Sequence, residues 1–175
     1  MRRTKYIGDT YSSESCLDRF EFLYEHYGNF EDYMRCEKRC FLYMLESMMM
    51  YSFWEEYCKK YNTQNRKAVI RRISECMDRG EVIDFLVKDD KLPEKVLYCY
   101  RNYVAMRIDY RIFVNALESI GGKDAELLRR YIKEEVDLNG IAAERIISYE
   151  TAKGKIRDLK KLLKEKTLYY MREAS

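Results

Sequence analysis

Apolar residues recur three or four positions apart over most of this 175-residue chain, a spacing typical of helices that bury one face. Alternating runs of β-branched residues are scarce, and Pro93 is the single proline. The pattern therefore predicts an all-α fold. The expected helices are Glu14–Tyr27, about 31–61, Lys67–Asp78, Glu94–Ile120, Asp124–Tyr131, Leu138–Arg145 and a last helix from Ser148 onward. Gly80 is expected to end the helix Lys67–Asp78.

The clearest break in this pattern is the charged, turn-forming stretch 88–93, which carries the proline. We expect a helical N-terminal part, 1–90, that serves dimerisation or contact with a partner, and a C-terminal part, 91–175. The mostly polar residues 1–13 are predicted to form a loose leader. The triplet Met48-Met49-Met50 predicts a central core helix or, alternatively, a surface for a partner protein, because three adjacent side chains cannot all point inward.

The stretch from Leu138 to Leu163 has the pattern of two helices joined by a tight turn. Ala142 is small enough to let the helices approach closely, and Ile147 is expected to fill the gap at the turn. Ser148 has a short acceptor side chain suited to capping the next helix. One buried stripe is predicted along that helix, made by Ala152, Ile156, Leu159 and Leu163.

This stretch resembles region 4 of bacterial sigma factors and the related C-terminal modules of small phage late-transcription regulators. The resemblance covers about the last third of the chain and implies a three-helix helix-turn-helix unit, with 124–131 and 138–145 as its first two helices and the recognition helix from Ser148. The family's leucine and glycine before the turn are Arg145 and Ile146 here. Either Ile146 takes over the leucine's packing role, or the turn lacks its usual left-handed glycine. Gly154 weakens the recognition helix by about 1 kcal/mol relative to alanine.

Basic charge is concentrated in this helix, where Lys153, Arg157, Lys160 and Lys164 form a basic row along the flank of the predicted stripe. From Arg145 to Ser175 there are nine Lys or Arg against four Asp or Glu, a net of +5, whereas the rest of the chain has a net of −2. Such a distribution is typical of a nucleic-acid surface, and a solvated helix face is the alternative. In a major groove, the residues facing bases would be Ser148, Tyr149, Glu150, Lys153 and Gly154, with Arg157 at the edge. The residues nearer the DNA backbone would be Lys155, Lys160, Lys161 and Lys164.

Other chemistry finds little support in the residues. No two of the six cysteines are separated by two residues, as the ligands of a zinc ribbon are, so we expect free thiols and no metal site. Cys36 and Cys40 share a predicted helix face, and Cys58 and His26 could in principle complete a set of metal ligands with them. No nucleophile or phosphate-binding loop is visible, so no enzymatic activity and no cofactor are predicted. No run of about 18 apolar residues exists, so no membrane contact is expected.

The leading functional hypothesis is a DNA-binding transcriptional regulator of phage or prophage type. It would act in the cytoplasm of a bacterial host cell on duplex DNA, with RNA polymerase or another host protein as a further partner and a homodimer as one possible assembly. The alternative is a phage-encoded inhibitor or adaptor that binds proteins, for example of host defence machinery, and keeps the helix-turn-helix as scaffold. A third hypothesis is a small sigma factor whose N-terminal helices form the promoter-melting region.

Overall fold

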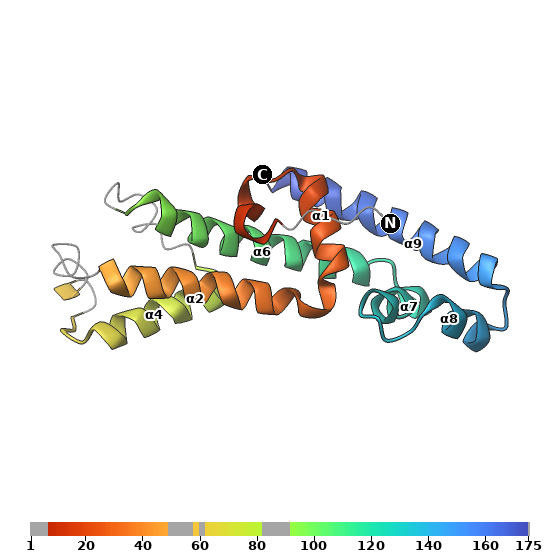
Figure 1. The fold of residues 1–175 in the computed structure, drawn as a ribbon, viewed down its shortest axis with the longest axis horizontal. Coiled ribbons are helices and arrows are strands. Elements are labelled where there is room, and N and C mark those ends of the chain that lie inside the picture. The colour runs from red at the N-terminus through yellow and green to blue at the C-terminus, as the bar shows by residue number, and fades with distance from the viewer. Residues whose placement is uncertain (1–6, 49–57, 60–61, 82–91, 175) are drawn as a thin grey trace. The chain divides into compact units, whose positions relative to one another are not determined.

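The computed structural model describes residues 7–48, 58–59, 62–81 and 92–174 (Figure 1). The described residues form helices joined by turns and short irregular segments and contain no strand, so the all-α prediction is confirmed for this part of the chain. The elements are η1 (Gly8–Ser13), α1 (Cys16–Glu25), η2 (Tyr27–Asn29), α2 (Phe30–Met48), α4 (Arg66–Arg79), α6 (Glu94–Glu118), α7 (Gly122–Ile132), α8 (Leu138–Arg145) and α9 (Tyr149–Glu173). The predicted continuation of the second helix to residue 61, and the side chains of the methionine triplet 48–50, lie outside the described part.

Two compact units make up the fold. One combines residues 1–32 with 106–175, and the other is 33–105. Both boundaries fall inside helices, α2 and α6, so the units do not coincide with the parts 1–90 and 91–175 expected from the sequence. A break in the apolar pattern marks where a helix ends, whereas a long helix can contribute to two cores without any break.

The unit 33–105 has a core of apolar side chains from α2, α4 and α6. Phe41 and Tyr100 lie with ring centroids 5.2 Å apart, and the Tyr103 hydroxyl donates to the carbonyl of Met77 at 3.1 Å. Helix α4 ends at Gly80 with φ 75°, a left-handed conformation that glycine adopts without strain. That helix end was predicted from the glycine, and the structure confirms it.

The larger unit begins with an aromatic cluster. Tyr11 is fully buried in η1 and makes edge-on ring contacts with Phe22 and Phe30, both at 5.9 Å. Ile7 is buried as well, so the prediction of a loose leader is wrong for residues 7–13. The physical reason is that one large aromatic residue can anchor a mostly polar segment.

A buried ionic network ties this segment to α1 and α6. The Tyr11 hydroxyl donates to Asp109 Oδ2 at 3.0 Å, and Arg19 Nη1 lies 3.4 Å from the same oxygen. Burial raises the pKa of Asp109 to about 6, although the Arg19 charge and the Tyr11 hydrogen bond act in the opposite direction. Charged groups this deeply buried are stable only when paired, so the network fixes how the three elements meet.

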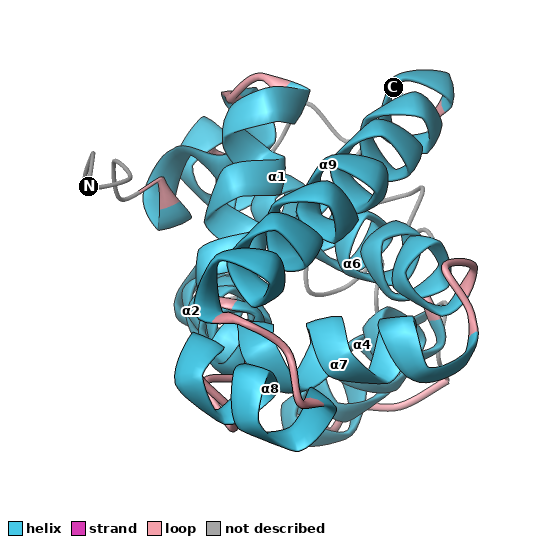
Figure 2. Cartoon of the chain, turned by 90° about the vertical axis from the view of Figure 1, so that its right-hand side faces the viewer, coloured by secondary structure: helices cyan, strands magenta, loops and turns pink. Residues whose placement is uncertain are grey.

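Helices α7, α8 and α9 form the end of the same unit that contains the candidate site, with α8 below the start of α9 (Figure 2). Asp137 caps α8 by accepting from the Gly140 amide at 2.7 Å. Residues 146–148 connect α8 to α9. The buried stripe predicted for the last helix is confirmed, and it extends to two further residues; the buried side chains are Ala152, Ile156, Leu159, Leu163, Thr167 and Met171.

The α8–α9 connection decides whether Ile146 has a packing role or whether the turn simply lacks its usual glycine. This residue is left-handed, with φ 54° and ψ 49°, and 94% of it is exposed. It therefore has no packing role, and the turn keeps the left-handed conformation without a glycine. Ile147 is half-buried beside it, as expected for the residue that fills the gap.

Candidate nucleic-acid interface

The N-terminus of α9 is fixed by its cap. Ser148 is extended, and its Oγ accepts a hydrogen bond from the Thr151 amide at 3.1 Å, which confirms the predicted cap. A second bond joins the Ser148 and Thr151 hydroxyls at 2.7 Å. The helix therefore begins at Tyr149, directly after the α8–α9 connection, and Tyr149 is 44% exposed.

Opposite the buried stripe, α9 presents a charged surface that we call the outer face, consisting of Glu150, Lys153, Arg157 and Lys161. These residues lie three or four positions apart and so share one side of the helix. Their side chains are 78%, 60%, 79% and 77% exposed, respectively. The outer face thus combines three cations on consecutive turns with one carboxylate near the start of the helix.

Among the described residues, the carboxylates within 4 Å of these cations belong to α9 itself. Lys153 lies 3.9 Å from Glu150, Arg157 lies 3.3 Å from Asp158, and Lys161 lies 4.0 Å from Glu165. Exposed pairs of this kind contribute about 0–1 kcal/mol each. A DNA phosphate or base edge could therefore replace these carboxylates at a small cost in free energy.

Lys155 is held differently. Its Nζ lies 2.8 Å from Asp124 Oδ1 on α7, and Arg145 at the end of α8 lies 3.4 Å from the same oxygen. The hydrogen bond from Lys155 lowers the pKa of Asp124, burial opposes this, and the charges of Lys155 and Arg145 lower it further. Asp124 thus joins α7, α8 and α9, so Lys155 has a positioning role in this unit.

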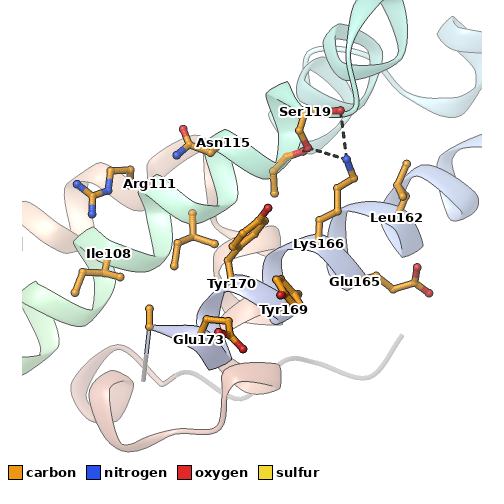
Figure 3. Close-up of a pocket in the computed structure, with 13 residues that line it drawn as sticks. Ile108, Arg111, Asn115, Ser119, Leu162, Glu165, Lys166, Tyr169, Tyr170 and Glu173 are labelled. Atoms are coloured by element: carbon orange, nitrogen blue, oxygen red, sulfur yellow. Dashed lines mark hydrogen bonds between the residues drawn. The ribbon is translucent and has the colours of Figure 1, made fainter.

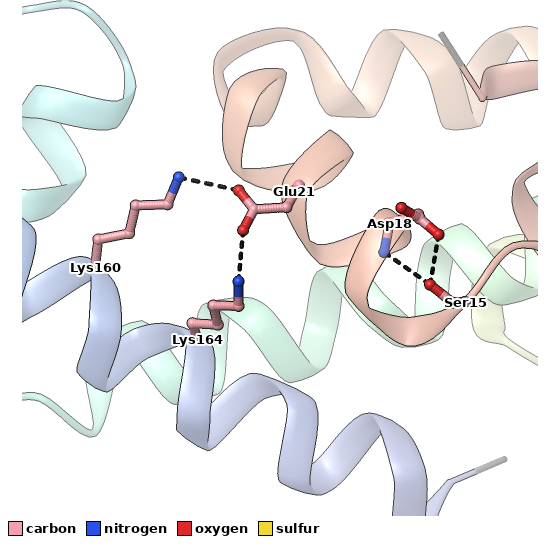
Figure 4. Close-up of polar contacts among 5 residues, drawn as sticks. All are labelled: Ser15, Asp18, Glu21, Lys160 and Lys164. Atoms are coloured by element: carbon pink, nitrogen blue, oxygen red, sulfur yellow. Dashed lines mark hydrogen bonds and ion pairs between the residues drawn. The ribbon is translucent and has the colours of Figure 1, made fainter. Parts of the chain in front are cut away.

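Lys160 and Lys164 are also engaged inside the molecule. Glu21 of α1 accepts from Lys160 Nζ at 3.0 Å and from Lys164 Nζ at 2.8 Å, one bond to each carboxylate oxygen (Figure 4). Lys160 Nζ also lies 4.1 Å from the centroid of the Tyr24 ring. Burial raises the pKa of Glu21, but the bonds and charges of the two lysines outweigh it and leave the pKa below its ordinary value. We call this arrangement the Glu21 bridge.

The basic row expected from the sequence, Lys153, Arg157, Lys160 and Lys164, is therefore divided between two surfaces. Its first two members lie on the outer face, and the other two bind α1. Phosphate contacts by Lys160 and Lys164 stay a prediction, and they now require the Glu21 bridge to break. Sequence reasoning missed Glu21 because it lies 139 and 143 positions from its partners, too far for any local spacing to indicate.

Gly154, expected to face bases, lies beside the outer face. A Cβ added there would meet no other heavy atom within 4 Å. The glycine is therefore not required for close packing against any of the described residues.

Among the described residues, no three His, Cys, Asp or Glu side chains are grouped so as to hold a metal ion. The sulfurs of Cys40 and Cys99 lie 3.8 Å apart in the unit 33–105.

Within the described ranges, no helix has both the length and the apolar character that crossing a membrane requires.

Comparisons of this chain with protein-family models, with curated proteins and with solved structures gave no match. The likeness to sigma region 4 therefore depends on the residues of the last third alone and stays a prediction.

Proposed function

We propose that this protein binds duplex DNA through the outer face of α9 and acts as a transcriptional regulator of the helix-turn-helix kind. The observation that carries the proposal is the row of Lys153, Arg157 and Lys161. These cations are highly exposed on consecutive turns and, among the residues that the structure describes, are paired within 4 Å only weakly, by exposed carboxylates of their own helix. Clustered cations of this kind provide the electrostatic part of DNA affinity.

The start of α9 supports base reading. In helix-turn-helix proteins the N-terminal residues of the second helix contact base edges in the major groove. Here the capped start places Tyr149, Glu150 and Lys153 at that end. Lys153 and Arg157 can donate to guanine, and Glu150 can accept from the amino group of cytosine. Lys161, two turns further on than Lys153, would contact phosphate and set the register.

The remaining lysines receive a supporting role in this proposal. Lys155 holds α9 to α7 through Asp124, and Lys160 and Lys164 hold α1 through the Glu21 bridge. Such contacts fix the direction in which α9 projects and leave the outer face as the DNA surface. The setting that the resemblance implies is a phage or prophage protein in a bacterial cell, which acts at a promoter or on RNA polymerase.

A second candidate function is the protein-binding inhibitor or adaptor. The observation that favours it is Ile146, which is 94% exposed in a left-handed turn directly before Tyr149. An exposed apolar side chain held in an unfavourable conformation suits contact with an apolar pocket of a partner protein.

A titration with labelled random-sequence duplex at two salt concentrations tests the proposal. We expect binding at low salt that weakens steeply as salt rises, and a clear loss of affinity in the double variant Lys153→Ala, Arg157→Ala. Arg71→Ala is the matched control, because Arg71 is 80% exposed on α4 and pairs with Glu75 of the same helix at 3.4 Å. Undetectable duplex binding at low salt, together with specific capture of a host protein that is lost in Ile146→Gly, would favour the adaptor instead.

A further inference from the structure

Two cysteines that lie 59 positions apart in the sequence meet in the unit 33–105. Cys40 belongs to α2 and Cys99 to α6, and the Cys99 thiol donates a hydrogen bond to the Cys40 sulfur at 3.8 Å. A disulfide needs a sulfur–sulfur distance of about 2.05 Å, so each sulfur would have to move by about 0.9 Å. A modest side-chain rotation together with a small helix shift supplies such a displacement.

Helix α6 meets its neighbours differently along its length. In the unit that contains residues 106–175, a groove of about 810 Å³ lies between the C-terminal halves of α6 and α9 (Figure 3). Beside the cysteines, by contrast, two buried rings bring α2 and α6 together. Phe41 and Tyr100 directly follow Cys40 and Cys99 in the sequence, and their ring centroids lie 5.2 Å apart. This contact fixes the register of the two helices, so the two sulfurs are held opposite one another.

The two thiols differ in their exposure. Cys40 is exposed, whereas Cys99 is half-buried and packs against the core of the unit 33–105. The pKa of the Cys99 thiol is raised to about 12, mainly by burial and further by the neighbouring Cys40 and Glu37. Cys99 therefore keeps its proton at neutral pH, and an oxidant that arrives from solvent meets Cys40 first.

We propose that Cys40 and Cys99 are a redox modification site, at which a peroxide forms a reversible disulfide between α2 and α6. The Cys40 thiolate attacks one oxygen of hydrogen peroxide, the O–O bond breaks, and hydroxide leaves a sulfenic acid on Cys40. The Cys99 sulfur then attacks the Cys40 sulfur, and the sulfenic hydroxyl departs as water with the Cys99 proton. The two thiols lose two electrons in total, and one peroxide is reduced to two water molecules.

The disulfide would change the stability of the unit in which it lies. It closes a long loop that begins at Cys40, contains α4 and ends at Cys99. Closing such a loop restricts the unfolded chain and thereby stabilises the folded one. The inference does not depend on DNA binding, because neither cysteine belongs to α9.

Peroxide treatment of the full chain at neutral pH tests the inference. Remaining thiols are blocked with iodoacetamide, and a non-reducing tryptic map is read by mass spectrometry. Trypsin separates Cys36 from Cys40, because Lys38 and Arg39 lie between them. We expect the peptide with Cys40 to be joined to the peptide with Cys99, at a mass lower by two hydrogens, and dithiothreitol to release both.

Cys40→Ser should abolish this cross-link, and Cys36→Ser is its matched control, because Cys36 is also exposed on α2. The oxidised wild type should melt several degrees above its reduced form, whereas Cys40→Ser should melt at one temperature under both conditions. Circular dichroism establishes that both variants keep their helices, and Cys99→Ser provides a second variant without the cross-link.

Cys40 and Cys99 that both remain open to iodoacetamide after peroxide treatment would overturn the inference. So would a Cys40 that is oxidised beyond the sulfenic acid without pairing, or one that joins a different cysteine or a second copy of the chain. A cross-linked protein whose melting temperature equals that of the reduced protein would overturn the stabilising role.

Discussion

Replacing Ile146 with glycine should stabilise the protein. Ile146 is β-branched and occupies φ 54°, ψ 49°, a conformation that L-residues adopt at a cost of about 1–2 kcal/mol. The side chain is 94% exposed, so its removal exposes almost no further apolar surface. Glycine relieves the backbone strain but is more flexible in the unfolded chain, which offsets about 0.5–1 kcal/mol. The expected net gain is about 1 kcal/mol.

Urea unfolding followed by circular dichroism measures this change, and a gain of that size corresponds to about 2–4 °C in the melting temperature of a chain this long. Ile146→Val is the matched control. It keeps a β-branched side chain in the same conformation and should leave stability unchanged. A glycine variant less stable than the wild type would refute the reasoning, because it would mean that the isoleucine makes a stabilising contact in the folded protein.

Three further outcomes are expected. Gly154→Ala should raise stability by about 1 kcal/mol by urea unfolding, since a Cβ there meets nothing within 4 Å; a loss would contradict that open space. The pKa of Asp109 rises from 3.8 to about 6 on folding, so protonation of this carboxyl stabilises the folded state. The stabilisation is complete below pH 3.8 and is lost as the pH rises through 6. The wild type should therefore gain more stability between pH 7 and pH 5 than Asp109→Asn, and equal gains would contradict the raised pKa. Glu21→Gln should lower stability by about 1 kcal/mol, since the bridge is partly exposed, and should tighten DNA binding at low salt by releasing two lysines; unchanged affinity would count against their release.

The sequence predicted those features that depend on neighbouring residues. The buried stripe of α9 follows from helical periodicity, the Ser148 cap from a short acceptor before an apolar run, and the end of α4 from Gly80. Each of these signals lies within a few residues of its effect.

Features that join distant segments could not be predicted in this way. Tyr11 is buried by rings and an aspartate from other elements, and nothing in its polar neighbourhood indicates that. The sequence shows the charged residues of α9, but it does not show which of them face solvent. Asp124 and Glu21 come within ion-pair distance of the α9 lysines only once the chain has folded. The candidate DNA surface is consequently narrower than the basic row that suggested it.

The salt dependence of duplex binding tests the central claim most directly. For each phosphate neutralised, the slope of log affinity against log salt changes by about 0.9. Because Lys161 is the outer-face cation assigned to a DNA phosphate, Lys161→Ala should have a slope shallower by about 0.9, whereas Lys160→Ala, Lys164→Ala should keep the wild-type slope. A slope unchanged in the outer-face variant, or lost only when the two bridge lysines are removed, would contradict the assignment of the outer face as the DNA-binding surface.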